Sequence, residues 1–411
     1  MDAEATRFVT VAERRARLAL RHRLVPSRRT DDVSAITRSL VALHSTDPTT
    51  ANLSVTQRMN KPAVAGVSAA LYDDRSIVRH HAMRRTLWVF EPAMARAAHA
   101  SCTAAIAVKE WNAFAAMLEA SEVTTDGAWW IRTARRRAIE IVGEFGTITA
   151  RQLGAVAPEL TAKLQLSVGK PYAGTQGAHT RLMLCLGFEG EAVRTRPSGG
   201  WTSGEYAWSL ADAWCSGGVA DASLSAAEGG ATLAHAYLTA FGPASTADLQ
   251  WWAGWSAATT KAALVAIGAV AVVMDDGSGG MVEGWLNADD TAAVVSDEPW
   301  CAVLPSLDPT IMGWKSRGWY LGGLGAFGGP LFDRNGNAGH HIWSSAPGVG
   351  GRVVGAWAQR SDGEIVTRFL VDVSVAERTA VDHEVRILRD TLGDTRFRPR
   401  YPAPIQPELL K

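Results

Sequence analysis

The sequence predicts an α+β protein in which three tandem winged helix-turn-helix units precede a small β-rich C-terminal domain. Three observations predict this fold. Groups of helical segments are each followed by strands, two segments resemble each other (FGTITARQL and FGPASTADL), and strand and turn patterns dominate after residue 297. A chain of 411 residues is also too long for one ordinary core. We expect domains at 1–115, 116–225, 226–296 and 297–411.

The first predicted unit has three helices and a strand. Apolar residues recur at helical spacing over 12–24, and a second such segment, 30–44, begins with a Thr-Asp cap. A third helix is predicted over 67–84, and the apolar strand that follows stops at Pro92. This order is typical of a winged helix-turn-helix module.

The same order recurs twice. In the second unit, a helix and a short strand-then-helix connection cover 133–160, a third helix covers 177–190, and a wing of two strands covers 192–209. In the third unit, three helices lead to a hairpin wing at 269–284. The C-terminal domain is predicted as strands between Gly, Pro and Asn-Gly turns, closed by a helix over 375–393.

Composition and motifs exclude several classes of protein. Apolar residues make up 47% of the chain and charged residues 20%, which describes a soluble globular protein. The N-terminus lacks the apolar core of a signal peptide, so we expect a cytoplasmic, nucleoid-associated protein without membrane contact. The four cysteines are scattered and are expected to be buried thiols, with no metal and no cofactor. Phosphate loops, GxSxG elbows and HExxH motifs are absent from the sequence.

The charge is distributed unevenly between the two halves of the sequence. Residues 1–200 carry 27 Lys and Arg against 18 Asp and Glu, a net +9, whereas residues 201–411 carry 14 against 23, a net −9. A basic half suits a phosphate-backbone partner, because cationic side chains release the counterions condensed on nucleic acid. The alternative is that the oppositely charged halves attract each other.

Four consecutive polar residues, His44-Ser45-Thr46-Asp47, end an apolar run and precede Pro48. One interpretation is ordinary turn chemistry, in which Thr46 or Asp47 binds nearby backbone amides and His44 ends a helix. The other is a catalytic cluster that holds and activates a water molecule. The residues alone leave both interpretations open.

Four motifs in order along the chain, LVALHSTDP, FGPASTADLQWWAGW, LPSLDPTIMGWKSR and FDRNGNAGHHIW, resemble the AlkZ/YcaQ-like bacterial DNA glycosylases. The resemblance covers nearly the whole chain. It implies three winged helices arranged in a C shape around a basic groove for duplex DNA, and a β-hairpin that reaches the lesion. It also implies that the protein releases alkylated purines. Some members of the family act on bulky genotoxin adducts or on crosslinks.

The resemblance also implies a catalytic Gln-x-Gln or Gln-x-Asp motif, from which this sequence departs. His44 stands at the first glutamine and Thr46 at the second, while Asp47 and Pro48 match the pattern. A histidine can replace glutamine as a hydrogen-bond partner and adds a nitrogen that titrates near neutral pH. Threonine is a weaker substitute, because its single hydroxyl lacks the separate donor and acceptor of an amide.

These residues suggest roles in attack of water on a deoxyribose. An alkylated purine is already a good leaving group, so a positioned base and a carboxylate suffice. His44 orients or deprotonates the water, Thr46 holds it, and Asp47 supplies negative charge facing the sugar. The seven lysines are scattered and none adjoins the motif, so a monofunctional mechanism is preferred to a lyase.

Three segments are predicted to contact DNA. The first is a helical face of Arg75, Arg79 and His80, with Arg84 and Arg85 following before the strand. The second is the wing with Arg194 and Arg196. The third is the hairpin tip with Arg334, Asn335 and Asn337, followed by His340 and His341. The alternatives are a solvated helix face and a surface turn with one inward and one outward histidine.

Three functions compete at this point. The first is a monomeric DNA glycosylase acting on double-stranded DNA that contains an alkylated purine. The second is a catalytically silent winged-helix DNA-binding protein or transcriptional regulator, and the third is a protein-interaction scaffold. Catalysis gains if His44 and Asp47 face an open basic groove, and loses if both are buried under the third unit.

Overall fold

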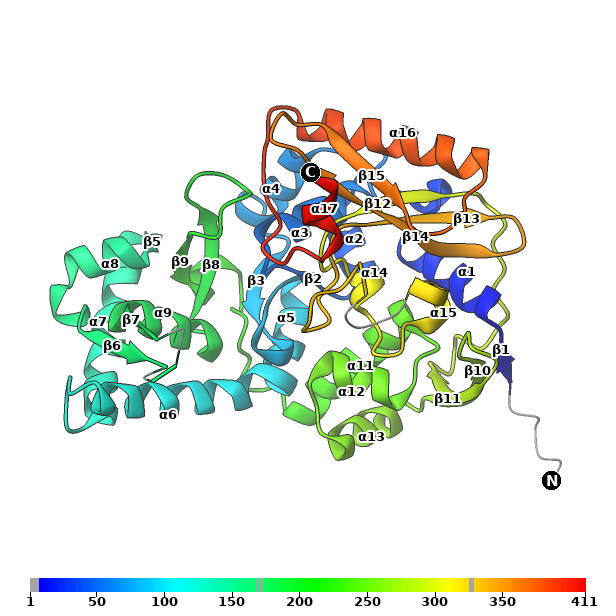
Figure 1. Cartoon of the computed structure of the whole chain (residues 1–411). Coiled ribbons are helices and arrows are strands. Elements are labelled where there is room, and N and C mark those ends of the chain that lie inside the picture. The colour runs from blue at the N-terminus through cyan, green and yellow to red at the C-terminus, as the bar shows by residue number, and fades with distance from the viewer. Residues whose placement is uncertain (1–6, 168, 171–172, 325–328) are drawn as a thin grey trace, which may run out of the picture. The chain divides into compact units, whose positions relative to one another are not determined.

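The chain divides by its contacts into two compact units. The structure, a computed structural model, describes residues 7–167, 169–170, 173–324 and 329–411. We call Met1–Ala70 together with Ala231–Lys411 the first unit of the structure, and Leu71–Gly230 the second unit. Helices and strands alternate irregularly along the chain in an α+β arrangement, as predicted (Figure 1). The four predicted domain boundaries stay predictions.

The N-terminal part of the first unit supplies the elements that carry the His44–Asp47 motif. They are β1 (Phe8–Val9), α1 (Val11–Arg21), α2 (Val33–Ser39), β2 (Leu43–His44) and α3 (Pro48–Thr56). Asp32 caps α2 by accepting from the backbone N–H of Ala35 at 2.9 Å. The helices expected over 12–24 and 30–44 are confirmed as α1 and α2, although His44 lies on a short strand rather than at a helix end.

The helix predicted over 67–84 is wrong in its second half. Helix α4 (Val64–Tyr72) ends early, and β3 (Val78–His81) pairs antiparallel with β4 (Leu87–Phe90). Arg75 adopts a left-handed φ of 54°, which a helix cannot accommodate. Every residue of β3 and β4 is buried, so burial in a sheet overrides the helical spacing of the charged residues.

In the second unit the predicted helix, strand-then-helix connection, third helix and wing occur in that order. After α5 (Pro92–Ala98) and a π-helical segment (His99–Thr103) come α6 (Ala104–Ala120), α7 (Gly127–Phe145), β5 (Ile148–Thr149), α8 (Ala150–Val156), β6 (Lys163–Leu166), β7 (Gly174–Gly177), α9 (Ala178–Glu189), β8 (Ala192–Pro197), β9 (Tyr206–Leu210) and α10 (Ala211–Trp214). Helix α6 and the β6–β7 hairpin were not predicted. The wing predicted over 192–209 is the antiparallel pair β8–β9. A capping box between Thr149 and Gln152 starts α8, which explains why this local signal is visible in sequence.

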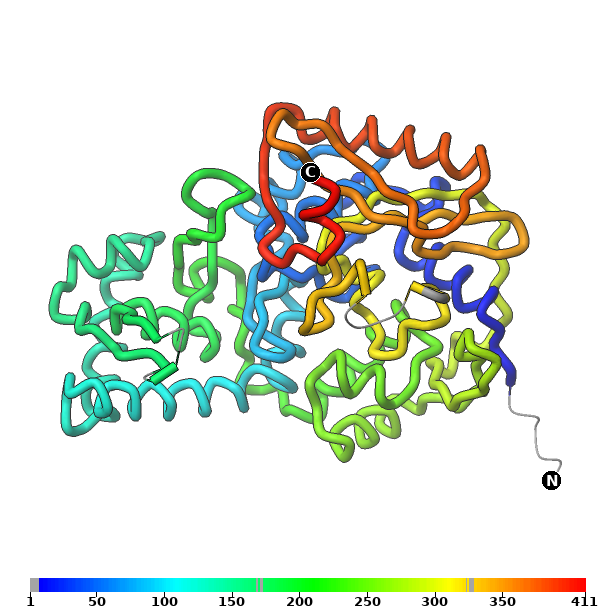
Figure 2. Tube along the Cα trace, in the orientation of Figure 1, coloured from blue at the N-terminus to red at the C-terminus, as the bar shows by residue number. Residues whose placement is uncertain are grey.

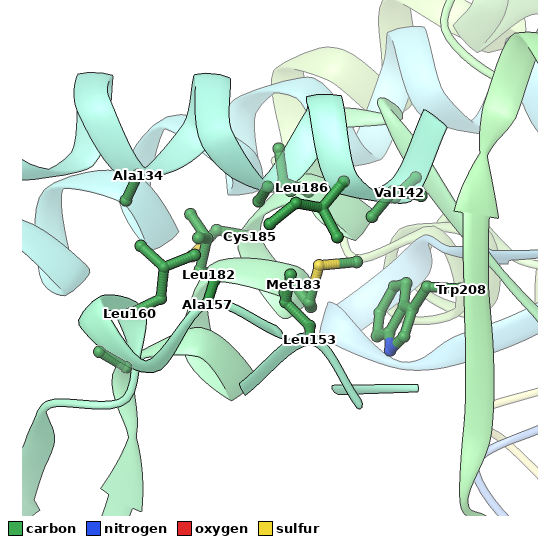
Figure 3. Packing of buried hydrophobic residues seen from close by; sticks show 14 of the residues in the cluster. Ala134, Val142, Leu153, Ala157, Leu160, Leu182, Met183, Cys185, Leu186 and Trp208 are labelled. Carbon is green, nitrogen blue, oxygen red and sulfur yellow. The ribbon is translucent and has the colours of Figure 1, made fainter. Parts of the chain in front are cut away.

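The core of the second unit lies between its helices and its sheet, in which β4, β3, β8, β9 and β5 are neighbours in that order. Leu153 of α8, Leu182 and Leu186 of α9 and Ala134 of α7 are buried together with Trp208 of β9 (Figure 3). This packing holds β8, which carries Arg194 and Arg196, against the helices.

The third group of predicted helices and its wing belong to the first unit. They are α11 (Ala226–Phe241), α12 (Thr246–Ala253), α13 (Ala257–Ala266), β10 (Val270–Asp275) and β11 (Met281–Leu286), as predicted. The sequence did not reveal that β1 extends this hairpin by pairing parallel to β10. Val9, Val272, Met274 and Leu286 are buried together beneath the resulting sheet.

The C-terminal region is a sheet with a helix, as predicted. Strands β12 (Cys301–Leu304), β13 (His341–Ala346), β14 (Gly350–Gln359) and β15 (Ile365–Phe369) pair in that order. Helix α16 (Val375–Leu392) is the predicted closing helix, and α14 (Pro309–Met312), α15 (Gly318–Leu321) and α17 (Ile405–Leu409) complete the region. The predicted Asn335-Gly336 hairpin is a tight turn closed by one bridge between Phe332 and Ala338.

Two smaller findings concern expectations from composition. All four cysteines are free and buried, as predicted. Among the described residues, none of the helices is both long enough and apolar enough to cross a membrane.

Candidate functional site

The His44–Asp47 motif lies between β2 and α3, where Asp47 caps the helix. Oδ1 of Asp47 accepts from the backbone N–H of Thr49 at 3.0 Å and from the Thr49 hydroxyl at 2.7 Å. Pro48 occupies the first helical position, where its missing N–H costs nothing. The backbone N–H of Thr46 donates to Nδ1 of His44 at 3.3 Å. Part of the turn chemistry considered as an alternative is therefore present.

The motif is covered rather than open. His44 is 4% exposed, Ser45 0% and Asp47 1%. The cover comes from the C-terminal chain of the same unit, because the backbone N–H of Arg400 donates to Oδ2 of Asp47 at 2.7 Å and Nη1 of Arg400 donates to the Thr46 carbonyl at 3.2 Å. His44 and Asp47 therefore do not face an open groove, which was the condition favouring catalysis, and the segment that covers them is the C-terminal chain rather than the third predicted unit.

The hydrogen bonds indicate what each side chain can still do. A carboxylate has about four acceptor positions, so the three donors on Asp47 leave one on Oδ2. Because Nδ1 of His44 accepts from Thr46, the proton of the neutral ring lies on Nε2. In this arrangement Asp47 can accept a proton from water.

A second Asp-Pro-Thr turn, at Asp308, is bound to helix α3 by hydrogen bonds. Asp308 caps α14, and its carboxylate accepts two hydrogen bonds from the guanidinium of Arg58, at 2.8 and 2.9 Å, and one from the Ser54 hydroxyl at 2.6 Å. Thr50 of α3 donates to the Ser306 carbonyl at 2.7 Å. The sequence interpretation missed this network, although the repeated phrase Asp-Pro-Thr is a visible signal for it.

The Asp308 carboxylate remains charged despite complete burial. Both Asp308 and Arg58 have fully buried side chains. Burial by itself raises the pKa of Asp308, but the charge and hydrogen bonds of Arg58 outweigh it and lower the pKa to about 2. This buried ion pair therefore holds α3, and with it the Asp47 cap, in place. Its carboxylate accepts from both Arg58 and Ser54.

His340 and His341 lie in the interior, not at a hairpin tip. They are 1% and 0% exposed, and the ring of His340 stacks on Trp357 at 4.0 Å between centroids. Burial lowers the pKa of His340 to about 3 and that of His341 to about 4. The alternative of one inward and one outward histidine is wrong, because both side chains are buried, and His341 is the first residue of β13.

These histidines predict a loss of stability in mild acid. The unfolded chain binds protons on both rings below their ordinary pKa of 6.5. The folded protein protonates His341 only near pH 4 and His340 only near pH 3. Their contribution is thus fully present above pH 6.5 and declines as the pH falls through that window, by up to about 1.4 kcal/mol per pH unit for each ring. Urea unfolding at pH 7, 6 and 5 measures this slope. His340→Phe keeps the stack on Trp357 and should make the slope shallower; an unchanged slope contradicts the prediction.

Two residues of the predicted DNA-binding helix are buried in strand β3. Arg79 is 2% exposed and donates to the Tyr72 hydroxyl, and His80 is 1% exposed with its Nε2 3.1 Å from Nδ1 of His99. Burial, and secondarily His99, lowers the pKa of His80 well below its ordinary value. The helical face proposed for these residues does not exist, because the segment is a central strand.

The wing arginines gather over aromatic rings of the second unit. The guanidinium of Arg194 lies 5.0 Å from the Trp208 ring centroid, and that of Arg196 lies 4.6 Å from Tyr72. Arg79 and Arg194 are register partners across β3 and β8. Arg196 also pairs with Asp73 at 2.8 Å, with 56% of its side chain exposed. The structure thus brings one residue of the predicted helix and two of the predicted wing into one cluster.

The remaining predicted contacts occupy turns. Arg75 lies on the Trp214 ring at 4.2 Å, and Arg84 and Arg85 have left-handed φ values of 55° and 61° between β3 and β4. Arg85 pairs with the buried carboxylate of Glu110 at 2.6 Å. These side chains sit on the surface of the second unit but are already engaged by protein groups.

The Asn335-Gly336 turn is organised by a neighbouring acid. Asp333 accepts from the backbone N–H groups of Asn335 and Asn337, at 2.8 and 2.9 Å, and from the side chain of Asn337 at 2.9 Å. Arg334 and Asn335 are exposed, whereas Asn337 is spent on the turn itself. Two of the three predicted tip residues therefore present polar groups to solvent.

Comparisons with known proteins agree with one another. The family model described as DNA glycosylase AlkZ-like matches residues 37–390. Among solved structures, the Streptomyces sahachiroi DNA glycosylase AlkZ is similar, with a TM-score of 0.66 and 19% identity, covering 93% of this chain and 97% of that one. At this identity the likeness concerns the fold. The search of curated proteins found no match.

Proposed function

The chain belongs to the AlkZ-like DNA glycosylase family, and we propose that it is a monofunctional glycosylase that releases N7- or N3-alkylated purines from duplex DNA. Bulky genotoxin adducts and crosslinks belong to the same proposed substrate class. The observation that carries the proposal is the family match over residues 37–390, a region that includes the whole His44–Asp47 motif.

The proposed chemistry is attack of water on C1′ of the deoxyribose. An alkylated purine carries positive charge, so its glycosidic bond is weakened and the leaving base needs no protonation. Asp47 accepts the proton of the attacking water at Oδ2 and stabilises the oxocarbenium-like sugar. The orientation of the same water is assigned to His44, with assistance from Thr46, as the sequence suggests. This assignment differs from the first expectation, in which His44 was a possible base.

The test is release of free base from duplex DNA that contains N7-methylguanine. Single-turnover measurement with protein in excess separates the chemical step from product release. Release of free base without strand cleavage supports a monofunctional glycosylase. Lack of release from this substrate and from a duplex carrying a bulky N7 adduct, with DNA binding intact, contradicts the proposal.

A catalytically silent DNA-binding protein is the second candidate. The observation that favours it is the occupied state of Asp47, which caps α3 and is 1% exposed. In that case the motif has only a structural role, and the two glutamines of the family pattern were replaced without loss of binding.

We further propose that the wing cluster of the second unit binds backbone phosphates. Arg196 is held by Asp73 and Tyr72 with more than half of its side chain exposed, so a phosphate can replace the carboxylate. Arg196→Ala should weaken binding of damaged and undamaged duplex alike and make the plot of log K against log salt shallower by about 1. Fluorescence anisotropy across a salt series measures this. Arg389→Ala, which removes an exposed arginine paired with Asp390, is the matched control. An equal effect of both variants contradicts a specific role for the wing.

A further inference from the structure

The C-terminal chain crosses the His44–Asp47 motif as a bridge with two anchors. We define the strap as residues 394–404, which connect α16 to α17 (red tube in Figure 2). At the first anchor, the backbone N–H of Phe397 donates to Oε1 of Gln359 at 3.2 Å. At the second, Ala403 is fully buried against Gly339, where an added Cβ would come within 2.4 Å of the Ala403 Cβ.

The middle of the strap is less buried than its second anchor, Ala403. Residues 398–402 are exposed or half-buried. In the described part of the chain, their hydrogen bonds are those of Arg400, from its backbone to Asp47 and from its guanidinium to the Thr46 carbonyl. Ala403 is buried, and the Phe397 ring packs against His340 and Trp357, so the ends of the strap can stay in place while this stretch opens, without unfolding of the C-terminal sheet.

We propose that the strap is a cover that shields Asp47 in the free protein and is lifted when duplex DNA binds. The inference rests on the proposed function, in which Asp47 faces the sugar. Asp47 is 1% exposed while the Arg400 amide occupies Oδ2, so it cannot contact a substrate until the strap moves. Duplex DNA supplies a stronger partner for the Arg400 guanidinium, because a charged phosphate oxygen forms a stronger hydrogen bond than the neutral Thr46 carbonyl.

Hydrogen exchange of the strap tests this directly. Pro399, Pro402 and Pro404 carry no amide hydrogen, so a peptide across the strap reports few positions, among them the Arg400 amide. In the free protein this amide should exchange slowly, and saturating undamaged duplex should increase its exchange. Unchanged or greater protection in a sample shown by anisotropy to be fully bound overturns the proposal.

Two variants measured without DNA give an independent result. Arg400→Ala removes the bond to Thr46 but keeps the backbone N–H, so opening of the strap should become about five-fold more frequent, the factor for one solvent-exposed hydrogen bond. Arg368→Ala removes an exposed arginine that pairs with Glu408 on α17, and should leave strap exchange unchanged. Equal exchange in Arg400→Ala and the parent protein overturns the proposal.

The outcomes separate this inference from the proposed function. If base is released but the strap stays protected, the proposed glycosylase function is supported and the proposed role of the strap is contradicted. If DNA opens the strap but no base is released, the proposed role of the strap is supported and the protein is a catalytically silent DNA-binding protein. Failure to bind duplex DNA overturns both.

Discussion

Replacement of Asp47 by asparagine is expected to slow base release from N7-methylguanine duplex by roughly 10²- to 10⁴-fold, the usual contribution of a positioned base. Asparagine is as good a helix cap as aspartate, so Oδ1 can still accept from Thr49 and α3 should remain folded. What the variant loses is the negative charge and the acceptor on Oδ2. Single-turnover kinetics with excess protein measure the effect.

The matched control is Asp32→Asn, which makes the same change at the cap of α2 in the same unit. Its rate should equal that of the parent protein. Asp47→Asn also removes the acceptor for the Arg400 amide, so it should loosen the strap. A more accessible motif with lower activity is a combination that a purely structural role of Asp47 does not produce. A parental rate in Asp47→Asn refutes its catalytic role.

Removal of the Asp308 carboxylate is expected to lower the free energy of unfolding by about 3–5 kcal/mol. Asp308→Ala leaves the fully buried Arg58 charge without its partner and leaves Ser54 without its acceptor. Most of the cost comes from the uncompensated charge rather than from the lost attraction. Urea unfolding at pH 7 measures the change.

The double variant Asp308→Leu with Arg58→Met separates these contributions. With both charges replaced by apolar side chains of similar size, a large part of the stability should return. Arg368→Ala, which breaks an ion pair on the surface, should cost less than about 1 kcal/mol. A loss in Asp308→Ala no larger than in Arg368→Ala contradicts the anchoring role of the pair.

Most of the helices could be predicted because their signals lie within a few residues of one another. Helix α8 begins with the Thr149–Gln152 capping box, and α12 begins with the equivalent pair Ser245 and Asp248. The β8–β9 wing follows from two short strands around a Pro-Ser-Gly-Gly turn. Such elements depend on local hydrogen bonds and periodicity, which one sequence displays.

The segment around Arg79 could not be predicted because its environment is set elsewhere. Arg79 and His80 have helical spacing in the sequence, yet they lie in a strand whose neighbours are β4 and β8. In the interior the Arg79 guanidinium donates to partners such as the Tyr72 hydroxyl, and no local sequence pattern predicts these partners. His340 and His341 were misplaced for the same reason, since polar residues after a turn are usually exposed.

The sequence by itself determined the β8–β9 wing and the family to which the chain belongs, because both depend on residues that are adjacent or in fixed order. Only the tertiary structure decided that Arg400 covers Asp47 and that Asp308 holds Arg58, contacts between residues 353 and 250 positions apart. Contacts at such separations arise from the packing of whole elements, and the same packing decides whether a polar motif is exposed or covered.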